Sequence, residues 1–537
     1  MTSATTERVD AVLVGAGFSG LYMAHKLNEL GFTFQGFEAA GDVGGTWFWN
    51  RYPGARTDSL HHIYCYSFSK ELAQEWSWTE RYPSQPEMLS YLSHVADRFD
   101  LRKHFRFGTR VQSAHFDGDN SEWVVSTESG DVIRARFVIT AVGLLSAPNI
   151  PPFTGIENFQ GDWYHTARWP HDEVDFTGKR VAVIGTGSTG IQIAPKIAET
   201  AGELTIFQRT PNYVVPAQNR PLSTAEQADI KARYTEIWRR LREHPFAMDF
   251  QAPGRNALDV DAEERERIYE EAWGKGGFHF LFEAFDDLQV DEVANETACE
   301  FIRSKIRQAV DDPEVAELLS PRGYPYGSKR PPSGTGYYEI FNRDNVRLVD
   351  VSTDSISEVT AEGLRTQSGR TWEFDAIVFA TGFDASTGSL TRIDIRGRDG
   401  IELATKWEGG PVTNLGFSTA DFPNLIMLSG PLSPFANIPV CSEENVDWVA
   451  ACLSHMRENG LSTIEAEASA EAEWVAHVND VANQILAAKG EKVNTWFAGA
   501  NIDGKAHAIN VYFGGSNAYF KACRDAAAAG YKGFILA

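Results

Sequence analysis

Apolar residues near the amino terminus form two short runs separated by a helical stripe. Residues 11–14 are a continuous apolar run that leads into the turn GAGFSG, and the next ten residues, LYMAHKLNEL, carry apolar side chains at helical spacing. A second run at residues 32–37 ends in Glu38. The pattern predicts strand, glycine turn, helix and strand, the unit that binds one dinucleotide.

The same order of elements recurs in the middle of the chain. The apolar run at residues 181–184 leads into a second turn, GTGSTG, and another strand is predicted at residues 204–207. One glycine fingerprint is weak evidence, but two complete units with matched spacing are strong. We therefore expect two nucleotide-binding units. Their turn glycines are Gly15, Gly17 and Gly20 in the first unit and Gly185, Gly187 and Gly190 in the second.

A further repeat follows each unit. TESGDVIRARFVITAVG at residues 127–143 and TQSGRTWEFDAIVFATG at residues 366–382 share a Ser-Gly turn at the same offset. In both, a β-rich run then ends in a small residue and glycine. Each is predicted to be a hairpin whose last strand completes one nucleotide domain.

Residues 221–324 interrupt the second unit and are predicted to be helical. Ser223 and Glu226 form a candidate capping box. A stripe at helical spacing follows, and core packing explains it better than cofactor binding. The stripe consists of Ile230, Tyr234, Ile237, Trp238 and Leu241.

We expect three parts along the chain. Residues 1–145 and 383–537 form the first nucleotide domain, residues 146–222 and 325–382 form the second, and residues 223–324 are an insertion within the second. The predicted fold class is α/β, with two Rossmann-like dinucleotide-binding domains and a helical insertion.

Composition and charge are those of a soluble globular protein. The 537 residues, 43% of them apolar and 23% charged, suffice for more than one core. The net charge of −24 repels phosphate backbones and anionic lipid headgroups. There is no signal-peptide pattern and no run of eighteen apolar residues. We expect a cytoplasmic protein, a monomer or weak homo-oligomer, that binds neither nucleic acid nor membrane.

The charge at the end of the second strand of each unit predicts its nucleotide. Glu38 can accept both ribose hydroxyls and would repel a 2′-phosphate, which suits FAD. The corresponding residue of the second unit is Gln208, followed by Arg209 and Thr210. Two opposite charges about 4 Å apart near a protein surface interact by roughly 4 kcal/mol. The second site therefore suits NADPH over NADH, although Glu38 and Arg209 also fit a role as solvated strand-end charges.

Two nucleotides in one chain indicate hydride transfer from nicotinamide to flavin, with a disulfide, a quinone or oxygen as the final acceptor. The cysteines are scattered and no two are close in sequence, so disulfide reduction and a metal site are not expected. Oxygen is the favoured acceptor. The five cysteines are Cys65, Cys299, Cys441, Cys452 and Cys523.

Two further motifs resemble those of Baeyer-Villiger monooxygenases. FQGDWYHTARWP, residues 159–170, is similar to the family fingerprint, with Trp169-Pro170 as the detail that separates it from N-hydroxylating relatives. GGTWFWNRYPGARTD, residues 44–58, matches a second family pattern, and with ATGFD and TWFAGAN the resemblance extends along nearly the whole chain. The matching fingerprint residues are Phe159, Gly161, His165, Trp169 and Pro170, and those of the second pattern are Gly44, Gly45, Trp47, Tyr52, Pro53, Gly54 and Asp58.

The resemblance implies an enzyme that uses FAD, NADPH and oxygen to convert ketones to esters or lactones through a C4a-peroxyflavin. It implies that Arg330 is the active-site arginine and that Asp58 holds it, whereas without the resemblance Lys329 and Arg330 would be interpreted as a solvated basic pair. Lys329 would join Arg209 and Thr210 at the 2′-phosphate, and Phe435 would line the substrate pocket. The other implied cofactor contacts are Thr46, Trp47, Tyr64, Val111, Ser188, Thr189, Gln192 and Trp496.

Several alternatives stay open. His165 is interpreted as a structural or hinge residue between two segments rather than a proton-transfer group, because the fingerprint of this family lies at an interdomain linker. One rival function is N- or S-oxygenation by a flavin monooxygenase, which would not require Arg330. The other is a non-catalytic, dinucleotide-binding redox sensor that reports NADPH levels. The physiological ketone does not follow from the sequence.

Overall fold

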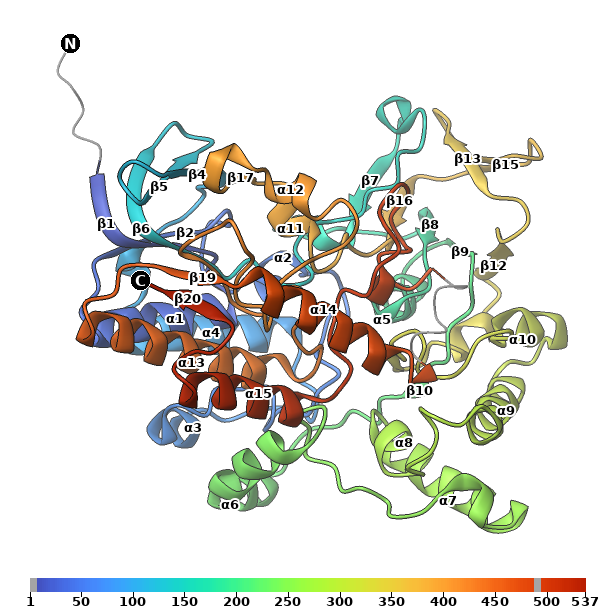
Figure 1. Cartoon of the computed structure of the whole chain (residues 1–537). Helices are drawn as coiled ribbons and strands as arrows, with labels where there is room; N and C mark the ends of the chain where they lie inside the picture. Colours follow the sequence, from blue (N-terminus) through green and yellow to red (C-terminus); the bar gives the residue numbers. More distant parts are fainter. Residues whose placement is uncertain (1–6, 487–493) are drawn as a thin grey trace.

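The computed structural model describes residues 7–486 and 494–537 and contains two main sheets, one in each half of the molecule (Figure 1). Helices of the first and last parts of the chain lie against the first sheet, and a group of helices extends from the second. No helix in these described ranges combines the length and the apolar character needed to cross a bilayer.

The first sheet has the order β17-β4-β5-β6-β1-β2-β3, with β18 paired to β6. Its centre is parallel, because β1 pairs in parallel with both β2 and β6. β17 and β18 come from the chain after residue 382 and extend this sheet. Its strands are β1 (Glu7–Val14), β2 (Phe34–Phe37), β3 (Phe105–Arg106), β4 (Val111–Asp117), β5 (Glu122–Thr127), β6 (Val132–Thr140), β17 (Asp394–Arg396) and β18 (Leu425–Met427).

Helices cover the first sheet and pack on one another. Tyr22 donates to Asp447 at 2.7 Å, and Ser19 and Ser442 share a hydrogen bond, so α1 and α13 lie side by side. These helices are α1 (Phe18–Glu29), α2 (Thr46–Trp49), α3 (Lys70–Glu75), α4 (Gln85–Arg98), α11 (Gly388–Thr391), α12 (Leu403–Lys406), α13 (Ile438–Glu458), α14 (Ala468–Ala482) and α15 (Ser516–Ala528), with β19 (Ile464–Ala466) and β20 (Phe534–Leu536) as a separate pair.

The second sheet is parallel throughout and has the order β12-β9-β8-β16-β7. The strand–turn–helix–strand order predicted around GTGSTG is present. Its elements are β7 (Asp162–His165), β8 (Arg180–Ile184), α5 (Ser188–Ala198), β9 (Glu203–Gln208), β12 (Val346–Asp350) and β16 (Ala376–Phe379).

The two predicted hairpins differ in one respect. In the first, β6 is one continuous strand that pairs antiparallel with β5 and then parallel with β1. In the second, the expected single strand is divided. β15 (Thr371–Glu373) stays with β14 (Gly363–Thr366) and β13 (Ile356–Val359) in a small separate sheet, and β16 joins the parallel sheet. The division falls at Asp375, whose carboxylate accepts from the backbone and guanidinium of Arg180 instead of continuing the hairpin.

The insertion is helical, as predicted, and the capping box is present. Ser223 accepts from the backbone N–H of Glu226 at 3.2 Å, and Glu226 accepts from that of Ser223 at 3.0 Å. Four stripe residues are buried and Ile230 packs at their edge, which confirms the core interpretation. The helices are α6 (Thr224–Glu243), α7 (Ala262–Lys275), α8 (His279–Phe282), α9 (Glu292–Ala309) and α10 (Pro313–Leu319), and a short pair, β10 (Val215–Pro216) and β11 (Ser333–Gly334), flanks them.

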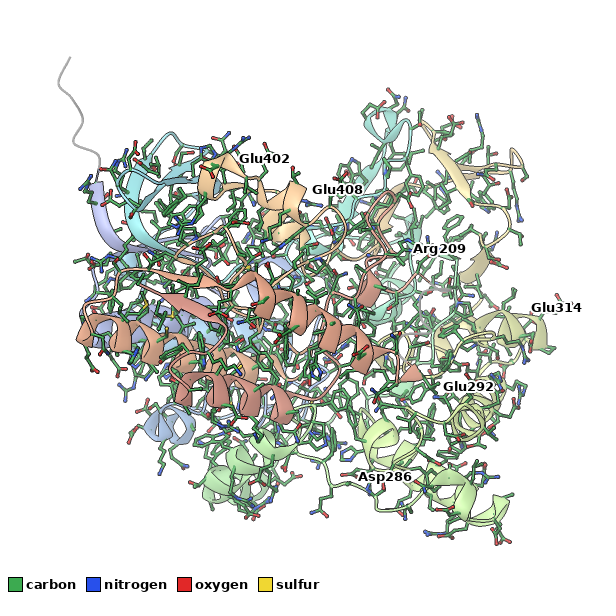
Figure 2. All side chains as sticks on the ribbon, in the orientation of Figure 1. Arg209, Asp286, Glu292, Glu314, Glu402 and Glu408 are labelled. Carbon is green, nitrogen blue, oxygen red and sulfur yellow. The ribbon has the colours of Figure 1, made fainter. Side chains whose placement is uncertain are left out.

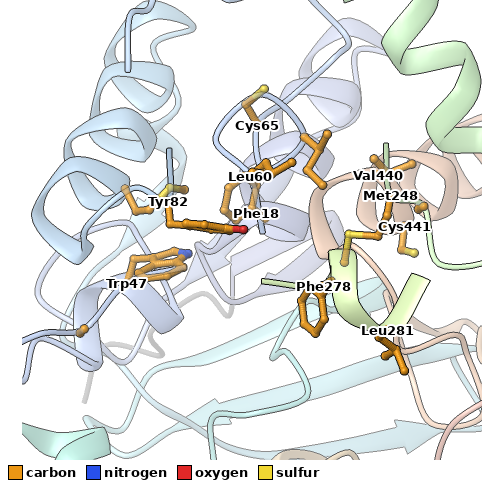
Figure 3. Packing of buried hydrophobic residues seen from close by; sticks show 14 of the residues in the cluster. Phe18, Trp47, Leu60, Cys65, Tyr82, Met248, Phe278, Leu281, Val440 and Cys441 are labelled. Carbon is orange, nitrogen blue, oxygen red and sulfur yellow. The ribbon is translucent and has the colours of Figure 1, made fainter. Parts of the chain in front are cut away.

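One apolar core joins the insertion to the first half of the chain. Figure 3 shows members of this cluster from three parts of the chain: Cys65 and Trp47 from the first unit, Met248 and Phe278 from the insertion, and Cys441 from α13. The helical insertion therefore packs against segments that the sequence separates widely.

The turn glycines make equivalent close contacts in both units. A Cβ on Gly20 would meet the Gly15 carbonyl oxygen at 1.9 Å, and a Cβ on Gly190 would meet that of Gly185 at 2.1 Å. A Cβ on Gly187 would have nothing within 4 Å. The lack of a side chain at Gly20 and Gly190 lets the helix pack closely on the turn, whereas the open space at Gly187 leaves room for a ligand.

We predict that Gly190→Ala lowers the free energy of unfolding by about 1–3 kcal/mol, because the added methyl overlaps backbone that cannot move aside. Gly187→Ala is the matched control and should stay within about 0.5 kcal/mol of wild type. Urea unfolding of both variants measures this, and equal losses would contradict the packing explanation.

Candidate functional site

A cavity of about 1010 Å³ lies where the first unit, the second glycine turn and the insertion meet. Most of the predicted site residues line it. They are Thr46, Trp47, Asp58, Tyr64, Gly185, Gly187, Ser188, Thr189, Gln192, Arg209, Thr210, Lys329, Arg330, Phe435 and Trp496, whereas Gly15, Gly17, Gly20, Glu38, Val111 and Gly190 lie outside its lining.

Arg330 and Asp58 form an ion pair in the wall of this cavity, with 25% and 16% of their side chains exposed. The guanidinium also lies over the rings of Phe278 at 5.4 Å and Phe435 at 5.8 Å. Burial alone would lower the pKa of Arg330, but attraction and a hydrogen bond to Asp58 raise it above the ordinary value. The cavity thus contains a permanent cation held by one carboxylate between two aromatic faces.

Trp496 continues this row of aromatic groups. Its ring packs edge-on against Phe435 with centroids 4.7 Å apart. It belongs to a short turn of 3-10 helix, Trp496–Ala498, so a segment near the carboxyl terminus reaches the same wall.

Glu38 directly follows β2, at the predicted position, but its carboxylate has backbone partners. Its two oxygens accept from the N–H groups of Ala16 and Ala40, each at 2.7 Å. Burial raises the pKa of Glu38, and these hydrogen bonds oppose the rise. Each oxygen keeps a second lone pair, so the site still fits a ribose that donates hydroxyl hydrogens.

In the second nucleotide-binding unit, the side chains of Gln208 and Arg209 point in different directions. Gln208 is buried and donates to the Leu318 carbonyl at 2.8 Å, away from the cavity, whereas Arg209 is exposed and lines it. Figure 2 labels Arg209 beside the second sheet. Burial and repulsion from Arg209 lower the pKa of Lys329 to about 8. Within the described residues neither cation pairs with a carboxylate, and the two together suit a phosphate.

The motif around Tyr52 joins the first unit to the second glycine turn. Tyr52 donates to the side chain of Gln192 at 2.8 Å, and Gln192 donates to the backbone carbonyl of Arg56 at 3.1 Å. The start of α5 is therefore fixed to the loop that carries Asp58.

His165 is buried at the point where the two sheets are connected. Its Nδ1 accepts from the Ala167 N–H at 3.1 Å, so Nε2 carries the hydrogen that it donates to the Asn149 carbonyl at 3.3 Å. Thr381 donates to the same carbonyl, and Asn149 and Thr381 lie on the two chain crossings between the sheets. Burial lowers the pKa of His165 to about 4, and repulsion from Arg168 acts in the same direction. These contacts fit the structural role, and a hinge motion stays a prediction.

Sequence reasoning missed one wall of the cavity. The insertion contributes Phe246, Met248, Phe278, Leu281 and Phe282 to the lining. The aromatic-rich stretch FHFLFEAF, residues 278–285, was a signal in the sequence, but helical periodicity alone assigns such residues to a core.

The comparisons with known proteins agree with this geometry. A family model described as FMO-like, Flavin-binding monooxygenase-like, matches residues 8–226. The Baeyer-Villiger monooxygenase of Pseudooceanicola batsensis is 44% identical over 528 residues, which cover 98% of this chain and 96% of the relative. The chain belongs to the Baeyer-Villiger monooxygenase family.

Two further similarities bear on the fold and on the activity. The structure of cyclohexanone monooxygenase from Rhodococcus sp. Phi1 bound to NADP+ matches with a TM-score of 0.96 and 46% identity, covering 99% of each chain. The match confirms the α/β fold with two Rossmann-like domains. The phenazine N-monooxygenase of Lysobacter antibioticus is 42% identical over 529 residues, 98% of this chain and 97% of the relative. The family therefore includes a close relative named for N-oxygenation.

We predict that His165 makes stability depend on pH. Its pKa is lower in the folded protein, about 4, than the ordinary 6.5, so the unfolded chain binds the proton first. Its contribution is complete above pH 6.5 and falls by about 3 kcal/mol as the pH drops to 4. Urea unfolding of wild type and His165→Gln across this range measures it, and a stability difference that stays constant with pH would disprove it.

Proposed function

We propose that the protein is an NADPH- and oxygen-dependent flavin monooxygenase that converts ketones to esters or lactones. The observation that carries the proposal is the Arg330–Asp58 ion pair inside a largely apolar cavity that also contains the second glycine turn. Family membership supports the reaction class, and the relative that oxidises cyclohexanone supports cyclic ketones as substrates.

Arg330 has the chemistry that this reaction needs. Its guanidinium does not lose its proton at physiological pH, so it stays a donor and a fixed positive charge. Negative charge develops on the carbonyl oxygen of a ketone under nucleophilic attack, and a fixed cation in a low-dielectric cavity stabilises it. Asp58 orients the guanidinium and balances its charge between turnovers.

FAD, when bound, supplies oxygen activation, and NADPH supplies the electrons. We assign FAD to the first unit, with Gly15, Gly17, Gly20, Glu38 and Val111 around its adenosine and diphosphate. Thr46, Trp47 and Tyr64 lie on the cavity side of that unit. The second unit would hold NADPH through Gly185, Gly187, Ser188, Thr189, Gly190 and Gln192, with Arg209, Thr210 and Lys329 at the 2′-phosphate and Trp496 along the cofactor.

The domain limits drawn from the sequence belong to the same proposal. β17 and β18 in the first sheet support the return of residues 383–537 to the FAD domain. We also propose a cytoplasmic location, which the five unpaired, buried cysteines support. The monomeric or weakly oligomeric state stays a prediction.

N-oxygenation is the second candidate, because one relative carries that activity in its name. It uses an electrophilic oxygen donor and does not require Arg330. The non-catalytic sensor has less support, since the relatives named above are enzymes.

We predict that Arg330→Ala retains bound FAD but forms ester at least about 100-fold more slowly, because an essential stabilising donor is lost. Purified protein is incubated with NADPH and a panel of cyclic and open-chain ketones. Mass spectrometry then detects products that gained one oxygen atom.

Arg322→Ala is the matched control, since Arg322 is exposed, lies in the same loop and, among the residues that the structure describes, forms its ion pair with Glu317 on the surface. It should behave as wild type. Ester formation by Arg330→Ala at near wild-type rate would refute the proposed role. If thioethers and amines are oxidised but no ketone yields an ester even with wild type, N- or S-oxygenation is the activity.

We predict that Arg209→Ala loses about tenfold of its preference for NADPH over NADH, because one of two cations at the 2′-phosphate is removed. Steady-state kcat/KM for both nucleotides measures the ratio. An equal fall in kcat/KM for NADPH and NADH would show that Arg209 does not bind the 2′-phosphate.

A further inference from the structure

Arg168, within the fingerprint segment, reaches from the second unit onto the first. Its guanidinium lies over the Trp49 ring at 4.2 Å, and Trp49 is the last residue of α2. It also donates to the carbonyls of Ala167 at 2.9 Å and Ser146 at 3.4 Å. The side chain therefore bridges both units, and two of its five N–H donors are used in these contacts.

The surroundings of Arg168 are positively charged in a protein whose net charge is −24. Burial lowers the pKa of Arg168 to about 10, repulsion from Arg110 and Arg392 adds to this, and attraction to Glu38 opposes it. Within the described residues Arg168 forms no ion pair with a carboxylate. The attraction to Glu38 does not offset burial and the repulsion from the two arginines, so a further anion beside Arg168 would stabilise its charge.

The same groups surround the adenosine end of the first glycine-turn unit. Arg110 follows Thr109, whose N–H donates to the Glu38 carbonyl at 2.9 Å. Ser146 lies in the segment after β6, and a Cβ on Gly15 would meet the carbonyl oxygen of Ala141 in that segment at 2.5 Å. Arg392 donates to the Pro148 carbonyl at 3.3 Å. Three arginines thus lie in the region of Glu38, the residue after β2: one precedes β4, one is in the fingerprint segment and one follows α11.

We infer that Arg168 is an FAD-binding residue contributed by the second nucleotide unit, which closes the adenosine-diphosphate end of the flavin site with a positive charge stacked on Trp49. This inference rests on the proposed assignment of FAD to the first unit. The inferred contact does not belong to the glycine fingerprint of the first unit, because the Arg168 guanidinium comes from the second unit. Retention of FAD then depends on how the two units sit together.

The experiment measures FAD release directly, without turnover. Purified holoenzyme is diluted, and the rise of free-flavin fluorescence is followed for wild type, Arg168→Gln, Arg168→Lys and Arg168→Ala. We expect release about tenfold faster for the Gln and Ala variants, with Lys in between, since the lost cation–π and charge contacts are of that size. Added salt should speed release from wild type more than from Arg168→Gln, because it screens only the charged contact.

Arg370→Ala is the matched control. Arg370 lies over Trp372 at 4.7 Å in the separate hairpin sheet, so its loss removes a similar stack away from the flavin unit, and release should stay at the wild-type rate. Release at the wild-type rate from Arg168→Gln would overturn the inference. A purified wild type without flavin absorbance would instead refute the proposed function. The Lys and Gln variants decide the question if the Ala variant does not fold.

Discussion

The ion pair between Arg330 and Asp58 is the contact on which the arrangement of the cavity depends. Its two members come from distant parts of the chain and meet in a partly buried, aromatic setting. Removing one partner of a buried pair costs about 3–5 kcal/mol, because the other charge is left without compensation. The ion pair therefore ties the loop YPGARTD to the loop that follows the insertion, and both loops line the cavity.

A second set of contacts fixes the two sheets at their crossings. His165 and Thr381 both bind the carbonyl of Asn149, and Asn501 donates to the carbonyl of Phe383 at 2.8 Å. Lys505 bonds to Asp384 in the same region. The segment that carries Trp496 is thus attached to the crossing after β16.

The insertion does more than enlarge the second unit. It packs into the core of the first unit and places aromatic side chains opposite the ion pair. The cavity is polar on the side of the second glycine turn, where Arg209 and Lys329 lie, and apolar on the side of the insertion. This division matches the needs of a reaction in which a charged nucleotide and an apolar ketone occupy one space.

The sequence by itself determined the features that depend on neighbouring residues. Both strand, glycine turn, helix and strand units, the capping box of α6 and the position of Glu38 followed from local spacing, because backbone geometry constrains residues within one or two turns. The resemblance supplied Arg330 and Asp58. Only the tertiary structure decided which distant side chains meet. The side chain of Gln208 points toward the insertion, and the second hairpin is divided at Asp375. The insertion adds the wall around Phe282, and Arg168 lies over Trp49. These contacts depend on packing between segments that no sequence periodicity relates.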